Sequence, residues 1–139
     1  MTLSSDRTSL AWMPLSADPA LLQDVVACAG RHGVSGVHLS HGLCHDADDL
    51  LEHAGRAQRM ADFVRACRAA GLQVWCWTHE VCKPPALCLP AGHLDFDGPQ
   101  LWRHLEAKYD RFLGTVLPDL DGLVLTCAET DFLVYHDTR

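Results

Sequence analysis

The feature that most constrains the fold of this 139-residue chain is a regular alternation between strand-like and helix-like segments. Short, nearly continuous hydrophobic runs alternate with longer stretches in which apolar residues recur every three or four positions. The expected strands are residues 8–15, 34–41, 72–80 and 121–130, with a helical segment between each strand and the next. This order predicts an α/β fold, in which parallel strands are joined by right-handed helical crossovers.

Residues that commonly begin and end helices lie where these segments change. Asp18 precedes Pro19, which is the order expected of an N-cap residue and a proline at the first helical position. Gly33 and Gly71 follow the first two helical segments, and Pro118 follows the third. We therefore expect three strand–helix units and a fourth strand.

Two architectures fit this pattern, namely a doubly wound open sheet and part of a β/α barrel. No GxGxxG or GxxxxGK[ST] motif follows the first strand, which disfavours the nucleotide-binding forms of the doubly wound sheet. A complete barrel needs about 250 residues. We therefore expect residues 1–139 to form a single β/α domain, a partial (half) TIM-type barrel of about four strands and a fragment of a larger (β/α)8 barrel.

The composition excludes several classes of protein. The net charge is −7 and the 11 Lys and Arg residues are scattered, so neither a nucleic-acid surface nor binding to an anionic membrane is expected. No signal-peptide pattern and no apolar run of membrane-spanning length is present. The seven cysteines, an odd number without a CxxC pair, are typical of buried thiols in a reducing compartment, so we expect a cytoplasmic protein.

Polar side chains gather where three of the expected strands end. Ligands of parallel β/α folds bind at the carboxyl ends of the strands, so these positions are candidates for a site. Trp77 and His79 share one face of the third strand, whereas Glu80 belongs to the other face. The candidates are His41, His45 and Asp46 after the second strand, Trp77, His79 and Glu80 on the third, and Thr126, Glu129 and Asp131 on the fourth.

Glu129 is the strongest candidate for a chemical role. A carboxylate directly after the hydrophobic run LVLTCA must find a partner or reach a cleft. Asp46 is explained equally well as a helix N-cap, and a His79–Glu80 pair can be structural. Two carboxylates across a cleft suit cleavage of a glycosidic bond, because one protonates the leaving oxygen while the other acts as nucleophile or activates water.

Three segments, LSHGLCHDADDLLE, VWCWTHEVCKPP and LPDLDGLVLTCAETDF, together resemble the first half of bacterial β/α-barrel proteins of the glycoside-hydrolase type. The similar families act on hexosaminides or uronic acid glycosides and include α-glucuronidase-like proteins. The resemblance covers about residues 8–135. It implies a carbohydrate substrate, no cofactor and no metal, with Glu129 as general acid/base. The candidate catalytic residues are then Glu129 and Glu80, and the candidate substrate-binding residues are His41, His45, Asp46, Trp77, His79, Thr126 and Asp131.

Two other functions stay open. The first is a metal-dependent hydrolase, although a strand that presents two ligands prefers H-x-H, and His38, His41 and His45 are spaced differently. Its zinc or manganese ligands would be His41, His45, His79, Glu80 and Glu129. The second is a non-catalytic, sugar-binding or oligomerising module. A half-barrel leaves two strand edges and an apolar face uncovered, so we expect the isolated chain to be inactive and to self-associate.

Overall fold

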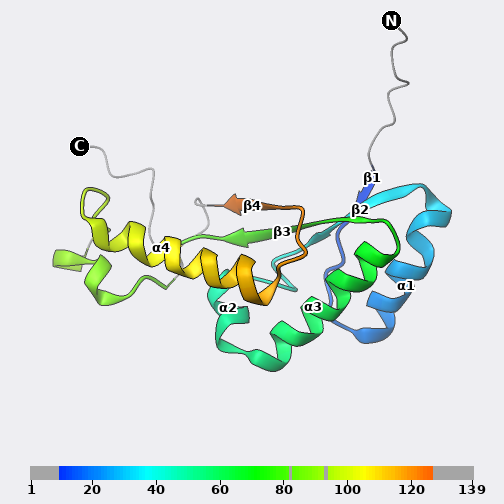
Figure 1. Ribbon diagram of the computed structural model, residues 1–139, viewed down its shortest axis with the longest axis horizontal. Coiled ribbons are helices and arrows are strands. Elements are labelled where there is room, and N and C mark those ends of the chain that lie inside the picture. Colours follow the sequence, from blue (N-terminus) through cyan, green and yellow to red (C-terminus); the bar gives the residue numbers. More distant parts are fainter. Residues whose placement is uncertain (1–9, 82, 93, 127–139) are drawn as a thin grey trace, which may run out of the picture.

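The computed structural model describes residues 10–81, 83–92 and 94–126. They form a mixed α/β fold around one four-stranded sheet, in which all three pairs of neighbouring strands are parallel and the order is β1-β2-β3-β4 (Figure 1). The predicted parallel sheet with helical crossovers is confirmed. The strands are β1 (Leu10–Trp12), β2 (Val34–Leu39), β3 (Gln73–His79) and β4 (Gly122–Thr126).

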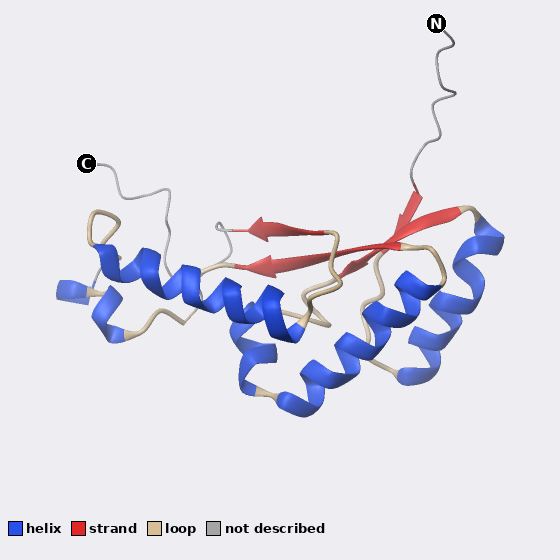
Figure 2. Cartoon of the chain, viewed as in Figure 1, coloured by secondary structure: helices blue, strands red, loops and turns tan. Residues whose placement is uncertain are grey.

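Four α-helices lie in the connections, and all four cover the same face of the sheet (Figure 2). This arrangement differs from a doubly wound sheet, in which helices cover both faces. A π-helical turn at Phe112–Val116 extends the last helix, and 3-10 turns lie at Gly30–His32, Ala86–Cys88 and Pro90–Gly92. The helices are α1 (Pro19–Ala29), α2 (Ala47–Glu52), α3 (Ala54–Ala69) and α4 (Pro99–Arg111).

The helix boundaries follow the predicted capping residues. Asp18 accepts hydrogen bonds from the backbone N–H groups of Ala20 and Leu21 at 2.9 and 3.0 Å, and Pro19 is the first residue of α1. Gly33 has a φ of 69° and stops the 3-10 turn that follows α1, a conformation that glycine adopts without steric cost.

The first strand is shorter than predicted. Pro14 has no backbone N–H group and cannot continue the ladder, so β1 ends at Trp12. The second strand also ends early, because Ser40 turns to donate a hydrogen bond of 2.7 Å to the carbonyl oxygen of Pro14. The predicted residues 8, 9 and 127–130 of the outer strands lie outside the described residues.

The main hydrophobic core lies between the sheet and the helices. A smaller cluster of Val81, Cys88, Leu94 and Leu101 packs the segment after β3 against α4. In the described ranges, none of the helices combines the length and the hydrophobicity of a membrane span. The centre of the main core is built from Val37, Leu39, Val74 and Cys76 of the sheet and from Leu22, Val25, Met60, Phe63 and Val64 of the helices.

The described cysteines are free thiols, and most are buried as predicted. Burial raises the pKa of Cys67 to about 11. A hydrogen bond with Cys44, together with burial, raises the pKa of Cys76 as well. Since the thiolate is the reactive form, these side chains act as small apolar groups at neutral pH.

Candidate functional site

The alternation of side chains along β3 divides the predicted site between the two faces of the sheet. Cys76 packs into the core against the helices, and Trp75, Trp77 and His79 therefore lie on the opposite side. We call this helix-free side the open face. The strand register adds neighbours from β2 and β4, so that the open face carries Gly36, His38, Gln73, Trp75, Trp77, His79, Gly122, Val124 and Thr126.

Four of the predicted residues meet at the carboxyl end of β2 and β3 and form what we call the ring cluster. Its members are His41, His45, Trp77 and His79. The ring centroids of His45 and His79 lie 4.7 Å apart, and those of His41 and Trp77 lie 5.8 Å apart at an interplanar angle of 88°. The centroids of Trp77 and His79 are separated by 6.4 Å. His41 and His45 are exposed, whereas His79 is buried beneath them.

The loop after β2 fixes the position and the tautomer of His79. Both the backbone N–H group and the ring Nδ1 of His79 lie within hydrogen-bonding distance of the carbonyl oxygen of His45, at 2.9 and 3.0 Å. A carbonyl oxygen only accepts, so Nδ1 carries the proton. In the neutral ring, Nε2 is then the acceptor nitrogen.

Asp46 is buried in the same loop and forms hydrogen bonds with two of its neighbours. One of its carboxylate oxygens accepts a hydrogen bond of 2.9 Å from the Asp49 N–H group, which makes Asp46 the N-cap of α2. The other oxygen lies 3.1 Å from Nδ1 of His45. Burial alone raises the pKa of Asp46, but these two hydrogen bonds and the positive charge of Lys83 outweigh burial and hold that pKa below its usual value. Asp46 is therefore placed to orient His45.

Close contacts between neighbouring segments fix the carboxyl ends of the strands and the loops that follow them. Gly42 approaches the loop after β1 so closely that a Cβ atom would lie 2.6 Å from the carbonyl oxygen of Leu15. Only glycine fits there, so the loop that carries His41 packs directly against the loop after β1. On the other side, Trp77 Nε1 donates to the hydroxyl of Thr126. Thr126 is the last described residue of β4, and the candidates Glu129 and Asp131 lie outside the described residues.

Glu80 points away from the ring cluster, as the strand alternation predicts. Its two carboxylate oxygens accept hydrogen bonds from Lys108 Nζ at 2.5 Å and from the Tyr109 hydroxyl at 2.7 Å. Both partners belong to α4, on the helix-covered side of the sheet. This geometry indicates a structural role for Glu80 and does not favour a catalytic one, because its carboxylate is buried, paired and on the opposite face from His79.

Lys108 completes a buried ion cluster, which consists of Asp48, Glu80, Lys108 and Tyr109. The ammonium group also donates a hydrogen bond of 2.9 Å to Asp48 on α2. Burial alone lowers the pKa of Lys108, but the carboxylates of Glu80 and Asp48 outweigh burial and raise it. Burial, followed by the hydrogen bond to Glu80 and by the charge of that carboxylate, raises the pKa of Tyr109. The cluster ties α2, the end of β3 and α4 together.

Lys108 is not among the residues predicted from the sequence, although a signal for it exists. It lies three positions after Leu105 and four before Phe112, inside the apolar stripe of α4. A lysine at such a position must bury its charge against a carboxylate. Asp48 lies in the first turn of α2, where a negative charge is favourable in any case, and its ion pair with Lys108 depends on the packing of two residues 60 positions apart in sequence.

The chain turns sharply where β3 ends. Val81 has a φ of 59°, in the left-handed region that β-branched residues rarely adopt. Its side chain is buried with Cys88 and Leu101 in the smaller cluster. Residues held in this way persist only where the surrounding packing determines them, and they are frequent near functional sites.

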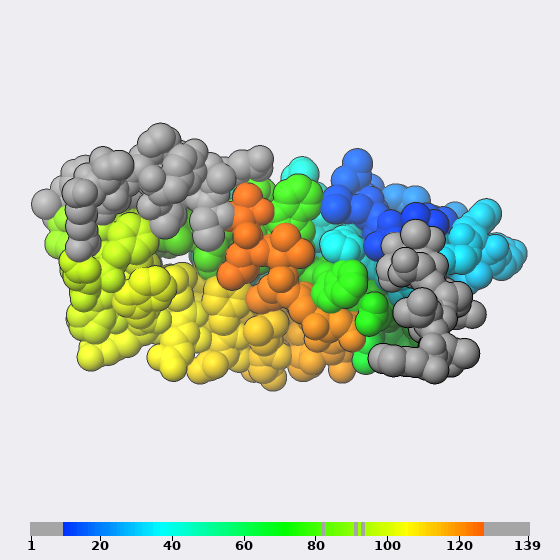
Figure 3. Space-filling model, turned by 90° about the horizontal axis from the view of Figure 1, so that it is seen from above, coloured from blue at the N-terminus to red at the C-terminus, as the bar shows by residue number. Residues whose placement is uncertain are grey.

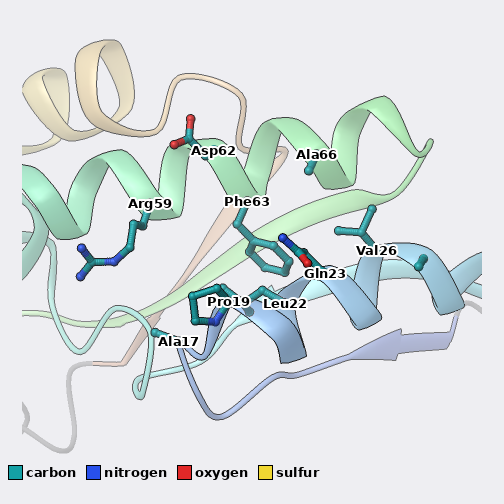
Figure 4. A pocket seen from close by; sticks show the side chains of 10 residues that line it. Ala17, Pro19, Leu22, Gln23, Val26, Arg59, Asp62, Phe63 and Ala66 are labelled. Atoms are coloured by element: carbon teal, nitrogen blue, oxygen red, sulfur yellow. The ribbon is translucent and has the colours of Figure 1, made fainter.

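A hollow on the other side of the molecule is separate from the ring cluster. It lies between α1 and α3, and its volume is about 430 Å³ (Figure 4). Leu22, Val26 and Phe63 line it, and Arg59 and Asp62 border it. None of the residues predicted for the site lines this hollow.

The described side chains do not form a metal site. Among them, no group of three or more His, Cys, Asp and Glu residues is arranged to hold a metal ion. Cys76 and Cys88, which lie 12 positions apart in the sequence, belong to different hydrophobic clusters. The geometry of the described residues therefore gives no support to the metal-dependent alternative.

Comparisons of the chain with protein-family models, with curated proteins and with solved structures found no match.

Proposed function

We propose that this chain is the sugar-binding half of a carbohydrate-active hydrolase built on a β/α barrel. The observation that carries the proposal is the ring cluster, in which Trp77 and three histidines meet at the carboxyl end of two adjacent parallel strands. Active sites of β/α barrels lie at this end of the strands. The chain would cleave glycosidic bonds as part of a complete barrel, with Glu129 as general acid/base.

The sheet topology supports the barrel part of the proposal. Strands in sequential order, all parallel and with helices on one face, have the arrangement of the first half of such a barrel. The open face would then be the barrel interior. A large residue lies beside a small one there, since a Cβ atom on Gly122 would be 3.0 Å from Cδ1 of Trp75. Alternation of large and small side chains is how small barrels fill their interior.

The ring cluster offers the contacts that a sugar requires. The indole of Trp77 provides an apolar surface for the C–H face of a pyranose ring, and the exposed rings of His41 and His45 provide hydrogen bonds for hydroxyl groups. His79 is buried and bonded to the loop carbonyl, so it positions these rings. Sugar binding is favoured over other ligands because the cluster combines an aromatic surface with exposed imidazole rings that can form hydrogen bonds.

Two carboxyl groups are needed for glycoside hydrolysis. We assign the general acid/base role to Glu129, three positions after Thr126 at the end of β4. Both oxygens of Glu80 and both oxygens of Asp46 are engaged in hydrogen bonds, so neither residue is proposed as the second carboxylate.

Sugar binding tests the proposal directly. Titration of the chain with methyl and aryl hexosaminides and glucuronides, followed by NMR, should shift the signals of the ring cluster. Trp77→Ala should weaken binding about tenfold, which corresponds to ~1.4 kcal/mol. Trp102→Ala is the matched control, because Trp102 is an exposed tryptophan on α4. Failure of every sugar to bind, or equal effects of the two substitutions, would overturn the proposal.

The role of Glu129 needs a separate assay. Turnover of aryl glycosides is to be measured on the longest natural protein that contains this chain. Glu129→Gln should reduce turnover by about 10²–10⁴-fold, the usual contribution of a general acid/base. Unchanged turnover would remove Glu129 from the mechanism and leave sugar binding without catalysis.

A further inference from the structure

We propose that two copies of this chain associate around a twofold axis parallel to their strands, so that β4 of each copy pairs with β1 of the other and eight strands close a barrel. This inference rests on the barrel part of the proposed function.

The first argument is the uncovered sheet. All-parallel sheets occur almost only where both faces are covered. Here the helices cover one face, and atoms of β3 and β4 lie at the surface of the other with no described helix above them (Figure 3). The open face is apolar at its centre, where Trp75 and Trp77 are half-buried and Val124 is 43% exposed.

The second argument is the pair of free edges. In the described part of the chain, β1 pairs only with β2, and β4 pairs only with β3. An edge strand presents a row of unpaired N–H and C=O groups, which readily take up another strand. The two edges lie at opposite ends of one parallel sheet, so the β4 edge of one copy can continue the parallel ladder only with the β1 edge of another.

Symmetry then selects the arrangement. A twofold axis parallel to the strands keeps every strand direction and places each β4 edge beside the β1 edge of the other copy. The two contacts are identical and the ring closes, so the assembly stops at two copies. A twofold axis perpendicular to the strands would instead pair β4 with β4 in antiparallel fashion and leave β1 open.

A second copy is the occupant because it offers what the described sheet lacks, namely a β1 edge for β4, a β4 edge for β1 and a second uncharged open face. Charge does not oppose the contact, since no Lys, Arg, Asp or Glu lies on the described open face.

The partner would also complete the site. An axis parallel to the strands places the carboxyl ends of all eight strands at the same mouth. The ring clusters of the two copies would then face each other across that mouth, and a sugar would contact rings from both.

Analytical ultracentrifugation of the full 139-residue chain over a range of micromolar concentrations tests the inference. We expect a species of twice the chain mass. Val124→Lys should reduce that mass to one chain, because two buried ammonium groups would face the barrel interior. The matched control is Leu21→Lys on α1, since Leu21 is 41% exposed and Val124 is 43% exposed. Only the first substitution should dissociate the pair.

A second measurement keeps the test decisive if Val124→Lys fails to fold. The thermal midpoint of the unchanged chain should rise with protein concentration, as it does when folding is coupled to association. A monomer that unfolds cooperatively at every concentration would overturn the inference. So would a mass that keeps growing with concentration, or equal effects of the two lysine substitutions. A monomer that binds sugar would overturn only the closure, and a dimer that binds none would overturn only the proposed function.

Discussion

Lys108 and Glu80 form an ion pair of 2.5 Å although they are only 5% and 3% exposed, and the pair joins α4 to the end of β3. The ammonium group is shared with Asp48 on α2 at 2.9 Å. Removal of one partner leaves a buried charge without compensation. The pair is therefore important for holding α4 against α2 and the end of β3.

Lys108→Ala should lower the free energy of unfolding by about 3–5 kcal/mol, the usual cost of breaking a buried ion pair. Urea unfolding monitored by circular dichroism measures this. Arg65→Ala is the control, because Arg65 and Asp62 form an ion pair in which the side chains are 52% and 58% exposed. That change should cost less than about 1 kcal/mol. Equal losses would show that the buried ion pair contributes no more to the free energy of unfolding than the exposed one.

The pH dependence of the same pair has a defined sign. The folded-state pKa of Lys108 is raised, so its stabilising effect is complete below the unfolded-state pKa of about 10.4 and is lost as the pH rises through the folded-state value. The urea midpoint should therefore fall at alkaline pH. In Lys108→Met, this part of the decline should be absent.

Much of the fold could be predicted from the sequence because its signals are local. The apolar runs and the capping residues Asp18 and Gly33 predict elements that the structure contains. Strand ends were less predictable, since the end of β2 depends on a hydrogen bond between Ser40 and Pro14, 26 positions apart. That bond requires the loops of two strands to meet, which the residue pattern does not encode.

In the candidate site too, local features could be predicted from the sequence, whereas long-range contacts could not. The alternation along β3 correctly predicts that His79 and Glu80 point to opposite faces. The partners of Glu80 could not be predicted, because Lys108 reaches it only through the packing of α4 against the sheet. The position of Asp46 at a helix start suggested an N-cap, and its hydrogen bonds to the Asp49 N–H group and to His45 now show why the loop holds its shape.

Asp46→Ala should destabilise the fold by about 1 kcal/mol at neutral pH, because it removes the N-cap of α2. The folded-state pKa of Asp46 is lowered, so its contribution is present above the unfolded-state pKa of about 3.9 and is lost as the pH falls through the folded-state value. The variant and the unchanged chain should therefore converge in stability toward pH 2, about two units below that pKa. A constant difference down to that pH would contradict this account.

Val81 should give an unusual order of stability. Val81→Gly and Val81→Ala both remove buried methyl groups, but glycine adopts a φ of 59° without strain and alanine does not. The glycine variant should therefore be the more stable of the two, by about 1 kcal/mol. Val74, a buried residue in the middle of β3, is the control, and there alanine should be more stable than glycine. The same order at both positions would show that the turn at Val81 carries no strain.

Gly122→Ala tests whether the indole of Trp75 packs against Gly122 of β4. The added methyl group would lie 3.0 Å from Cδ1 and 3.2 Å from Nε1 of Trp75, so the indole must move. We expect a loss of about 1–3 kcal/mol, typical of overpacking, and a shift in tryptophan fluorescence. Gly30→Ala is the control, because a Cβ atom there meets nothing within 4 Å and the backbone is right-handed helical. That variant should gain about 0.4–1 kcal/mol. If Gly122→Ala is as well tolerated as Gly30→Ala, then Trp75 does not pack on β4, and the alternation of large and small residues on the open face loses its support.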